Sequence, residues 1–141
     1  KVDTVKSKSS VGEYNKINIW GQNSTFAWIE YNNETQTKTS SDVTKLTVDE
    51  LTINLKKKNE IKQITFTATN TSEARFTNGI AIGTINDFKP ETGITLIGTC
   101  FGATGTLIGT CTVSLNNNSG KIQVWNAPTN TVKVELSGIY I

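Results

Sequence analysis

The chain of 141 residues contains no histidine and no methionine, and it has only two cysteines and two prolines. Histidine is the commonest general base and a very common neutral metal ligand. Its absence excludes a Ser-His-Asp or Cys-His catalytic site. Since the sequence begins at Lys1 and has no methionine, we also expect it to be an excised or processed piece of a longer protein.

The acidic residues supply no catalytic pair that the sequence can identify. Asp49 and Glu50 are neighbours on an expected strand, so their side chains diverge and cannot work together as glycosidase carboxylates do. The sequence does not position Glu30, Asp87 and Glu135 relative to one another. We therefore expect a protein that is not an enzyme, with no catalytic residues, no metal ligands and no cofactor.

Long hydrophobic runs and a strong charge imbalance are also absent. No segment reaches the 18 or more apolar residues of a membrane span, and none resembles a signal peptide. The net charge of +2 is too small to indicate a nucleic-acid partner. The main basic cluster, Lys56 to Lys58 with Lys62, is typical of a solvated strand end. The sequence therefore predicts neither membrane insertion nor nucleic-acid binding.

What the chain does have is a series of short runs in which apolar and polar residues alternate. The hydrophobic fraction is only 35%, and Thr and Asn are abundant, as expected for a β-protein with polar outer faces. From Val43 onward, about seven or eight such runs follow one another at spacings of roughly 8 to 12 residues. This pattern predicts an all-β domain, a compact antiparallel barrel or sandwich, with almost no helix.

A repeated hexapeptide lies at the centre of that domain. TLIGTC occurs at 95–100 and again at 106–111, with a glycine-rich linker between the copies. We expect the copies to form a hairpin that is symmetric about Ala103. Cys100 would then face Thr106 and Cys111 would face Thr95, so the thiols would not be opposite each other. We expect no disulfide, and we interpret both cysteines as small buried side chains.

Trp125 is the aromatic residue of most interest. Alternation with Ile122 and Val124 makes it point outward, beside Thr112 and Ser114 if the hairpin register holds. An exposed indole among short polar side chains suits the flat C–H face and the hydroxyls of a sugar. An equally good interpretation is an edge residue that packs under a loop or at a subunit contact.

The first 43 residues differ from the rest. Two strand-like runs within residues 14–31 predict a hairpin, and the polar tract that follows is typical of an exposed connection. We place the boundary after this tract, with a neck or linker segment at 1–43 and a β-barrel domain at 44–141. Trp20 and Trp28 extend apolar runs of the hairpin, and we interpret them as structural.

The order of these elements resembles that of a known family. The features in question are LTVDELTINLKKKNE from Leu46, FTATN, a loop around Pro90, IGT with an alternating strand, an Asn/Gly turn followed by Ile and Trp, and a terminal Gly-x-Tyr-x. Together they resemble the C-terminal head domain of receptor-binding proteins from the baseplate of tailed phages that infect lactic-acid bacteria, of the lactococcal phage type. The resemblance covers about residues 44 to 141.

This resemblance implies a compact antiparallel β-barrel head that assembles as a homotrimer and recognises cell-wall polysaccharide on the host during adsorption. In such proteins a β-rich neck joins the head to a shoulder, which fixes the trimer to other baseplate proteins. The N-terminal hairpin is more elaborate than a simple neck requires. The location that the resemblance implies is the virion, at the tail tip or baseplate.

The family's site residues can be carried over by position. Its Trp after the Asn/Gly turn falls on Trp125, and a His-x-Asp pair that faces the sugar falls on Thr112 and Ser114. An Arg that some relatives place on the final strand has no counterpart, and only Lys133 and Glu135 lie nearby. This departure indicates a different saccharide, or a site displaced along the subunit interface. The expected saccharide site comprises Trp125, Thr112, Ser114, Asn126, Lys133 and Glu135.

Two other functions remain open from the sequence. One is a structural virion or surface module without ligand binding, whose exposed Thr and Asn side chains face neighbouring subunits. The other is a carbohydrate-binding module appended to an enzyme, which should be monomeric. The sequence names neither the saccharide nor the host strain.

Overall fold

The structure, a computed structural model, describes residues 17–18, 25–26, 34–72 and 75–141. The chain divides into two compact units, Lys1–Glu34 and Thr35–Ile141. In the first unit, β1 (Ile17–Asn18) pairs antiparallel with β2 (Thr25–Phe26). These four residues belong to the segment in which the sequence predicts a hairpin, whereas Trp20 and Trp28 lie outside the described residues.

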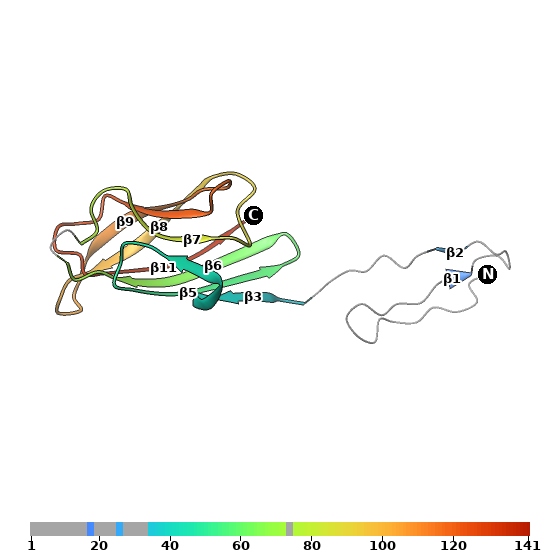
Figure 1. The fold of residues 1–141 in the computed structure, drawn as a ribbon, viewed down its shortest axis with the longest axis horizontal. Coiled ribbons are helices and arrows are strands. Elements are labelled where there is room, and N and C mark those ends of the chain that lie inside the picture. Colours follow the sequence, from blue (N-terminus) through green and yellow to red (C-terminus); the bar gives the residue numbers. More distant parts are fainter. Residues whose placement is uncertain (1–16, 19–24, 27–33, 73–74) are drawn as a thin grey trace. The chain divides into compact units, whose positions relative to one another are not determined.

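The described residues of the second unit form a sheet of nine antiparallel strands (Figure 1). In chain order these are β3 (Gln36–Thr39), β4 (Val43–Lys45), β5 (Glu50–Lys58), β6 (Ile61–Thr69), β7 (Ile80–Ile85), β8 (Ile94–Phe101), β9 (Leu107–Leu115), β10 (Lys121–Trp125) and β11 (Lys133–Tyr140). Across the sheet their order is β3-β5-β6-β11-β8-β9-β10-β7-β4.

The sheet nearly closes on itself because its two edge strands are consecutive in the chain. Only the short 3₁₀ helix η1 (Ser40–Asp42) separates β3 from β4. The two edge strands are not paired with each other in the described sheet, which is therefore barrel-like and nearly closed. The prediction of an all-β antiparallel barrel with almost no helix is confirmed for the described residues.

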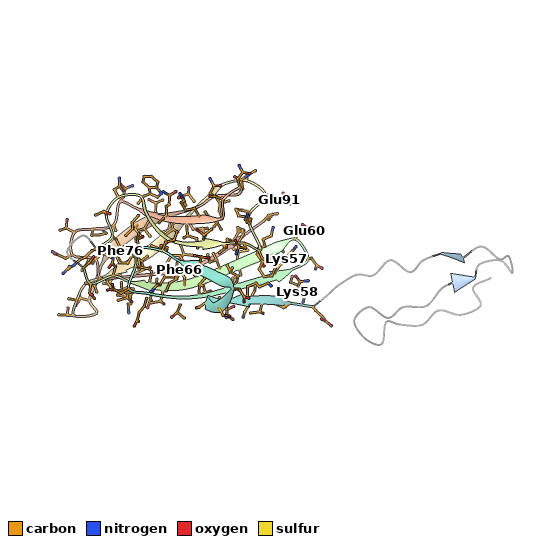
Figure 2. All side chains as sticks on the ribbon, in the orientation of Figure 1. Lys57, Lys58, Glu60, Phe66, Phe76 and Glu91 are labelled. Carbon is orange, nitrogen blue, oxygen red and sulfur yellow. The ribbon has the colours of Figure 1, made fainter. Side chains whose placement is uncertain are left out.

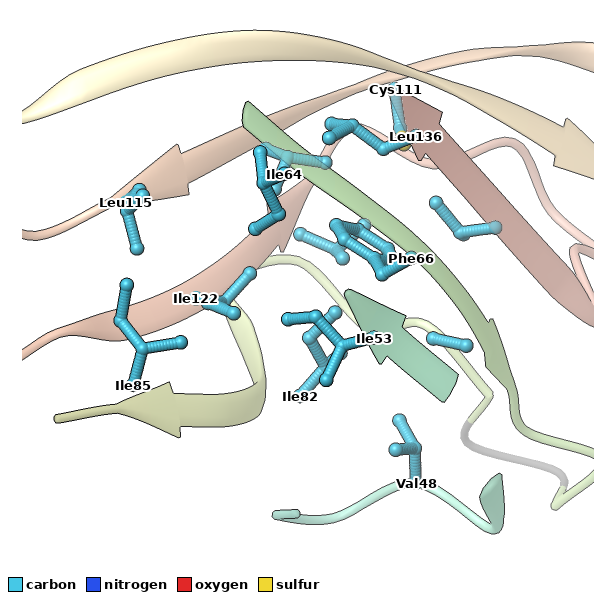
Figure 3. Packing of buried hydrophobic residues seen from close by; sticks show 14 of the residues in the cluster. Val48, Ile53, Ile64, Phe66, Ile82, Ile85, Cys111, Leu115, Ile122 and Leu136 are labelled. Atoms are coloured by element: carbon cyan, nitrogen blue, oxygen red, sulfur yellow. The ribbon is translucent and has the colours of Figure 1, made fainter. Parts of the chain in front are cut away.

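The interior of the barrel is filled by side chains that alternate along the strands (Figure 3). On β6, Ile64 and Phe66 point inward, and the neighbouring residues of the strand are more exposed. Each fully buried side chain of this size contributes about 1.5–3 kcal/mol to folding. Figure 2 shows Phe66 within the barrel and two charged residues, Lys58 and Glu60, at the tip of the β5–β6 hairpin.

The barrel unit begins at Thr35 and not at Thr44, because the polar tract that the sequence predicts as an exposed connection contains β3. No buried side chain anchors this strand. It is held by main-chain pairing with β5, for example between Gln36 and Lys57, and by the hydroxyl of Ser40, which accepts a 2.9 Å hydrogen bond from the Ile53 N–H. The lysine-rich end of β5 is therefore covered by β3 and is not an edge of the sheet.

The repeated hexapeptide forms the hairpin of β8 and β9, but its expected symmetry about Ala103 is wrong. Cys100 pairs with Gly109, and Cys111 pairs with Gly98. Both cysteines are free and buried, which agrees with their interpretation as small interior side chains. The register differs from the expected one, so the thiols lie on diagonal positions of the same inner face.

The turn of this hairpin explains the shifted register. Gly105 adopts a left-handed conformation with φ of +78°, which a glycine enters without steric cost. Its N–H donates to the carbonyl of Gly102 at 3.0 Å, and the Gly102 N–H donates to the carbonyl of Thr106 at 2.9 Å. A β-bulge between Cys100 and Phe101 adds to the shift.

Candidate functional site

Trp125 is the last residue of β10 and faces outward, as the alternation predicts. It pairs with Thr112 of β9, and its indole Nε1 donates a 2.9 Å hydrogen bond to Ser114 Oγ. The opposite edge of the ring lies over Gly79, where an added Cβ would come within 3.1 Å of the indole. The indole is therefore held from two sides and still remains 36% exposed.

The segment that supports the far edge of the indole precedes β7. Gly79 has a φ of +83°, and its N–H donates to the carbonyl of Val124 at 2.8 Å. Asn78 Oδ1 accepts a 2.8 Å hydrogen bond from the N–H of Asn126, which itself has a φ of +59°. Sequence reasoning did not assign Asn78 and Gly79 to the site, although the Asn-Gly dipeptide is a strong turn signal.

Two polar residues lie beside Trp125 on the outer face of the sheet. Thr112 and Gln123 are half-buried neighbours on the same outer face, and the Gln123 Nε2 donates to the Gly79 carbonyl at 3.1 Å. An aromatic side chain has few rotatable bonds, and this one is fixed by a hydrogen bond and by packing, so little entropy is lost when a ligand binds. The arrangement can provide a flat stacking platform with hydrogen-bonding groups at its margin.

Lys133 and Glu135 are not part of this arrangement. Both lie on β11, which is separated from β10 by β8 and β9, a displacement of about 14 Å at the usual spacing between strands. Lys133 Nζ lies 3.3 Å from Glu135 Oε1 and 4.6 Å from the centroid of the Phe101 ring. The structure therefore groups Trp125 with Thr112, Ser114 and Asn126, and it places the other two predicted site residues with each other.

Glu135 borders a shallow hollow of about 480 Å³ on the outer face of β6, β11 and β8. The other side chains around it are mainly short, including Thr99 and Ser137. Ile97 contributes to the hollow and also pairs with Thr112, so the outer face is continuous from this hollow to the surroundings of Trp125. Ile97 is 67% exposed, an unusual state for a large apolar side chain.

A second hollow, of about 490 Å³, lies between two loops at one end of the barrel. Figure 1 shows the loop before β7, the loop between β10 and β11, and the turn of the β8–β9 hairpin gathered at this end. The Val132 N–H donates to the Phe101 carbonyl at 2.8 Å, which ties two of these segments together. The polar residues around this loop-end hollow are Arg75, Thr77, Asn78, Thr129, Asn130 and Thr131.

Acidic and cysteine side chains in the described part of the chain form no group of three or more that could hold a metal ion.

No helix within the described ranges has the length and apolar character needed to cross a membrane.

Comparison of the chain with protein-family models gives no match, and comparison with curated proteins gives none either. The residues around Trp125 and the resemblance in the order of the sequence elements are therefore the features that bear on function.

Proposed function

We propose that this chain carries the receptor-binding head of a phage tail baseplate protein, and that it attaches the virion to its host by binding cell-wall polysaccharide at Trp125. The observation that carries the proposal is the indole itself, which is fixed by Ser114 and Gly79 and yet partly exposed beside Thr112. Saccharides bind such aromatic surfaces through their C–H faces and use their hydroxyls for hydrogen bonds. In this proposal the protein is a binding protein and performs no catalysis.

A single platform of this kind gives weak binding. One aromatic contact and one or two hydrogen bonds contribute only about 1 kcal/mol each, so one site holds a sugar with a dissociation constant in the millimolar range or weaker. A homotrimer, and several trimers on one baseplate, would convert this into tight attachment through effective concentration. We therefore include homotrimeric assembly and attachment to other baseplate proteins in the proposal.

The test is binding of the full chain to isolated cell-wall polysaccharide from candidate hosts, followed by replacement of Trp125. Trp125→Ala should reduce binding to background, while Trp125→Phe should retain part of it because an aromatic face remains. Leu107→Ala is the matched control, since it also removes an exposed apolar side chain and lies on the neighbouring strand β9. Unchanged binding by Trp125→Ala would reject the site.

A structural virion module is the second candidate, and the exposed apolar side chains of the outer face favour it. Ile97 and Ile139 are 67% and 68% exposed, and contact with a neighbouring subunit would cover them. Sedimentation analysis and cell-wall binding separate the candidates. An oligomer with no affinity for polysaccharide supports the structural module, a monomer that binds supports a carbohydrate-binding module of an enzyme, and a trimer that binds supports the receptor-binding head.

A further inference from the structure

The loop-end hollow has the dimensions of a ligand site and a charged group at its border. Its volume of about 490 Å³ lies within the range of about 300–1,000 Å³ that is usual for small-molecule sites. Arg75, the only arginine of the chain, lines it. Thr77 and Thr129 add hydroxyl groups from the two loops that enclose it.

The backbone of Arg75 is held in a conformation that a non-glycine residue rarely adopts. Its φ is +40°, in the left-handed region. The Asn70 side chain, only 3% exposed, donates a 2.7 Å hydrogen bond from Nδ2 to the Arg75 carbonyl, and the Arg75 N–H donates to the Ser72 carbonyl at 3.0 Å. Residues in such conformations persist where the surroundings determine them, and they cluster at functional sites.

The guanidinium has no anionic partner in the described part of the chain. The ion pairs among these residues join Lys38 to Asp87 and Lys133 to Glu135, and neither includes Arg75. The described hydrogen bond of the guanidinium runs from Nη1 to the neutral Asn130 Oδ1 at 3.5 Å, the limit for such a bond. A guanidinium prefers the two oxygens of a carboxylate or phosphate, which it binds with two parallel hydrogen bonds.

The hollow adjoins the surroundings of Trp125. Asn78, which lines it, accepts the hydrogen bond from the Asn126 N–H, and Gly79, the next residue, lies beneath the indole. Ala127 also lines the hollow and is two residues from Trp125. A saccharide that stacks on the indole is therefore next to the hollow, and a substituent on the sugar or the next sugar unit can enter it.

We propose that the loop-end hollow is a subsite for an acidic group, a carboxylate or phosphate, on the saccharide that stacks on Trp125, and that Arg75 binds this group. This inference rests on the proposed function. Its consequence is a preference for acidic over neutral saccharides. A charge-assisted hydrogen-bonded contact of this kind increases affinity about tenfold.

The test uses matched sugars and measures dissociation constants by NMR titration of the full chain. Methyl glucoside is compared with methyl glucuronide and with glucose 6-phosphate, and the galactose series is compared in the same way. The wild-type chain should bind one or both acidic sugars about tenfold more tightly than the neutral one. The comparison of methyl glucuronide with glucose 6-phosphate shows whether the site takes a carboxylate or a phosphate. Arg75→Gln should remove the preference and leave neutral-sugar affinity unchanged.

Lys121→Gln is the control, because it removes the same charge from the opposite end of β10 and should keep the preference. The amide resonances of Asn70 and Asn130 report whether Arg75→Gln disturbs the loops. Equal affinity for acidic and neutral sugars, or a preference that survives in Arg75→Gln, overturns the subsite while binding at Trp125 stands. If no sugar binds and Trp125→Ala changes nothing, the proposed function fails as well.

Discussion

The hydrogen bond from Trp125 Nε1 to Ser114 Oγ crosses from β10 to β9 along a diagonal. Trp125 pairs directly with Thr112, and Ser114 pairs with Gln123, so the 2.9 Å bond directs the indole nitrogen back along its own strand. The opposite edge of the ring then lies over Gly79. Ser114 therefore acts on the proposed site in two ways, as a proposed sugar contact and as the group that orients the indole.

Ser114→Ala should weaken saccharide binding without unfolding the barrel. The substitution removes a side-chain hydrogen bond worth about 1 kcal/mol, so affinity should fall roughly fivefold. The measurement is a titration of host polysaccharide or its component sugars, with the indole N–H resonance of Trp125 followed in the same spectra. Ser137→Ala, the same chemical change on the outer face of β11, should leave both readouts unchanged. An equal loss in the two variants would contradict the orienting role of Ser114.

Gly79→Ala should displace the indole, and a second glycine provides the control. Gly79 and Gly105 have similar φ values, +83° and +78°, so alanine costs roughly 1–2 kcal/mol of conformational strain at either position. A Cβ at Gly79 comes within 3.1 Å of the Trp125 ring, whereas a Cβ at Gly105 meets nothing within 4 Å. Urea unfolding should show destabilisation in both variants. Saccharide affinity and the indole N–H resonance of Trp125 should change only in Gly79→Ala.

Most strands and the outward position of Trp125 could be predicted from the sequence, because both depend on local signals. Alternation with period two gives the face of each residue relative to its neighbours, so Ile122 and Val124 were enough to orient Trp125. The strand β3 could not be predicted in this way. QTKT contains no apolar residue, and the strand exists because the edge of β5 is available for main-chain pairing.

Pairings between distant segments explain the other differences between the predicted site and the structure. The final strand β11 inserts between β6 and β8, so Lys133 and Glu135 lie far across the sheet from Trp125. No local pattern specifies that order. The proximity of Arg75 to Asn130 likewise depends on two loops that meet at one end of the barrel. The only signal of this position in the sequence is that the chain has a single arginine.

Asp49→Asn should destabilise the chain at neutral pH and have less effect in acid. Asp49 Oδ2 accepts hydrogen bonds from the N–H of Thr71 at 2.8 Å and from its hydroxyl at 2.7 Å. The backbone hydrogen bond from Thr71 is the main cause that lowers the pKa of Asp49 from its usual 3.8, followed by the hydroxyl. A lowered pKa means that this stabilisation is present above pH 3.8 and is lost as the pH falls through the lowered value.

Urea unfolding at several pH values checks this prediction. The stability difference between wild type and Asp49→Asn should be largest near neutral pH and should shrink below pH 3.8. Glu50→Gln is the control, because it removes the same charge from the exposed neighbouring residue. A difference that stays constant through the acid range would show that the charge of Asp49 is not responsible.

Alkaline pH should destabilise the barrel through two buried acids. Burial is the main cause that raises the pKa of Cys111 from 9.0 to about 12, and the hydrogen bond with the Cys100 thiol adds to it. Burial also raises the pKa of Tyr140 from 10.0 to about 12. Both groups are neutral in the folded chain at a pH where the unfolded chain has already ionised them. The contribution of these two groups to the free energy of unfolding is therefore fully present below pH 9.0, and it is lost as the pH rises toward about 12.

Tyr140→Phe separates the contribution of the phenol from that of the thiol. Tyr140 Oη donates a 2.6 Å hydrogen bond to the Phe88 carbonyl, so the variant should lose about 1 kcal/mol of unfolding free energy at pH 7. Above pH 10.0 its stability should fall less steeply than that of the wild type, because one titrating group is gone. Urea unfolding between pH 7 and pH 11 measures both effects. If the two pH profiles run parallel throughout, ionisation of Tyr140 makes no contribution to the alkaline loss of stability.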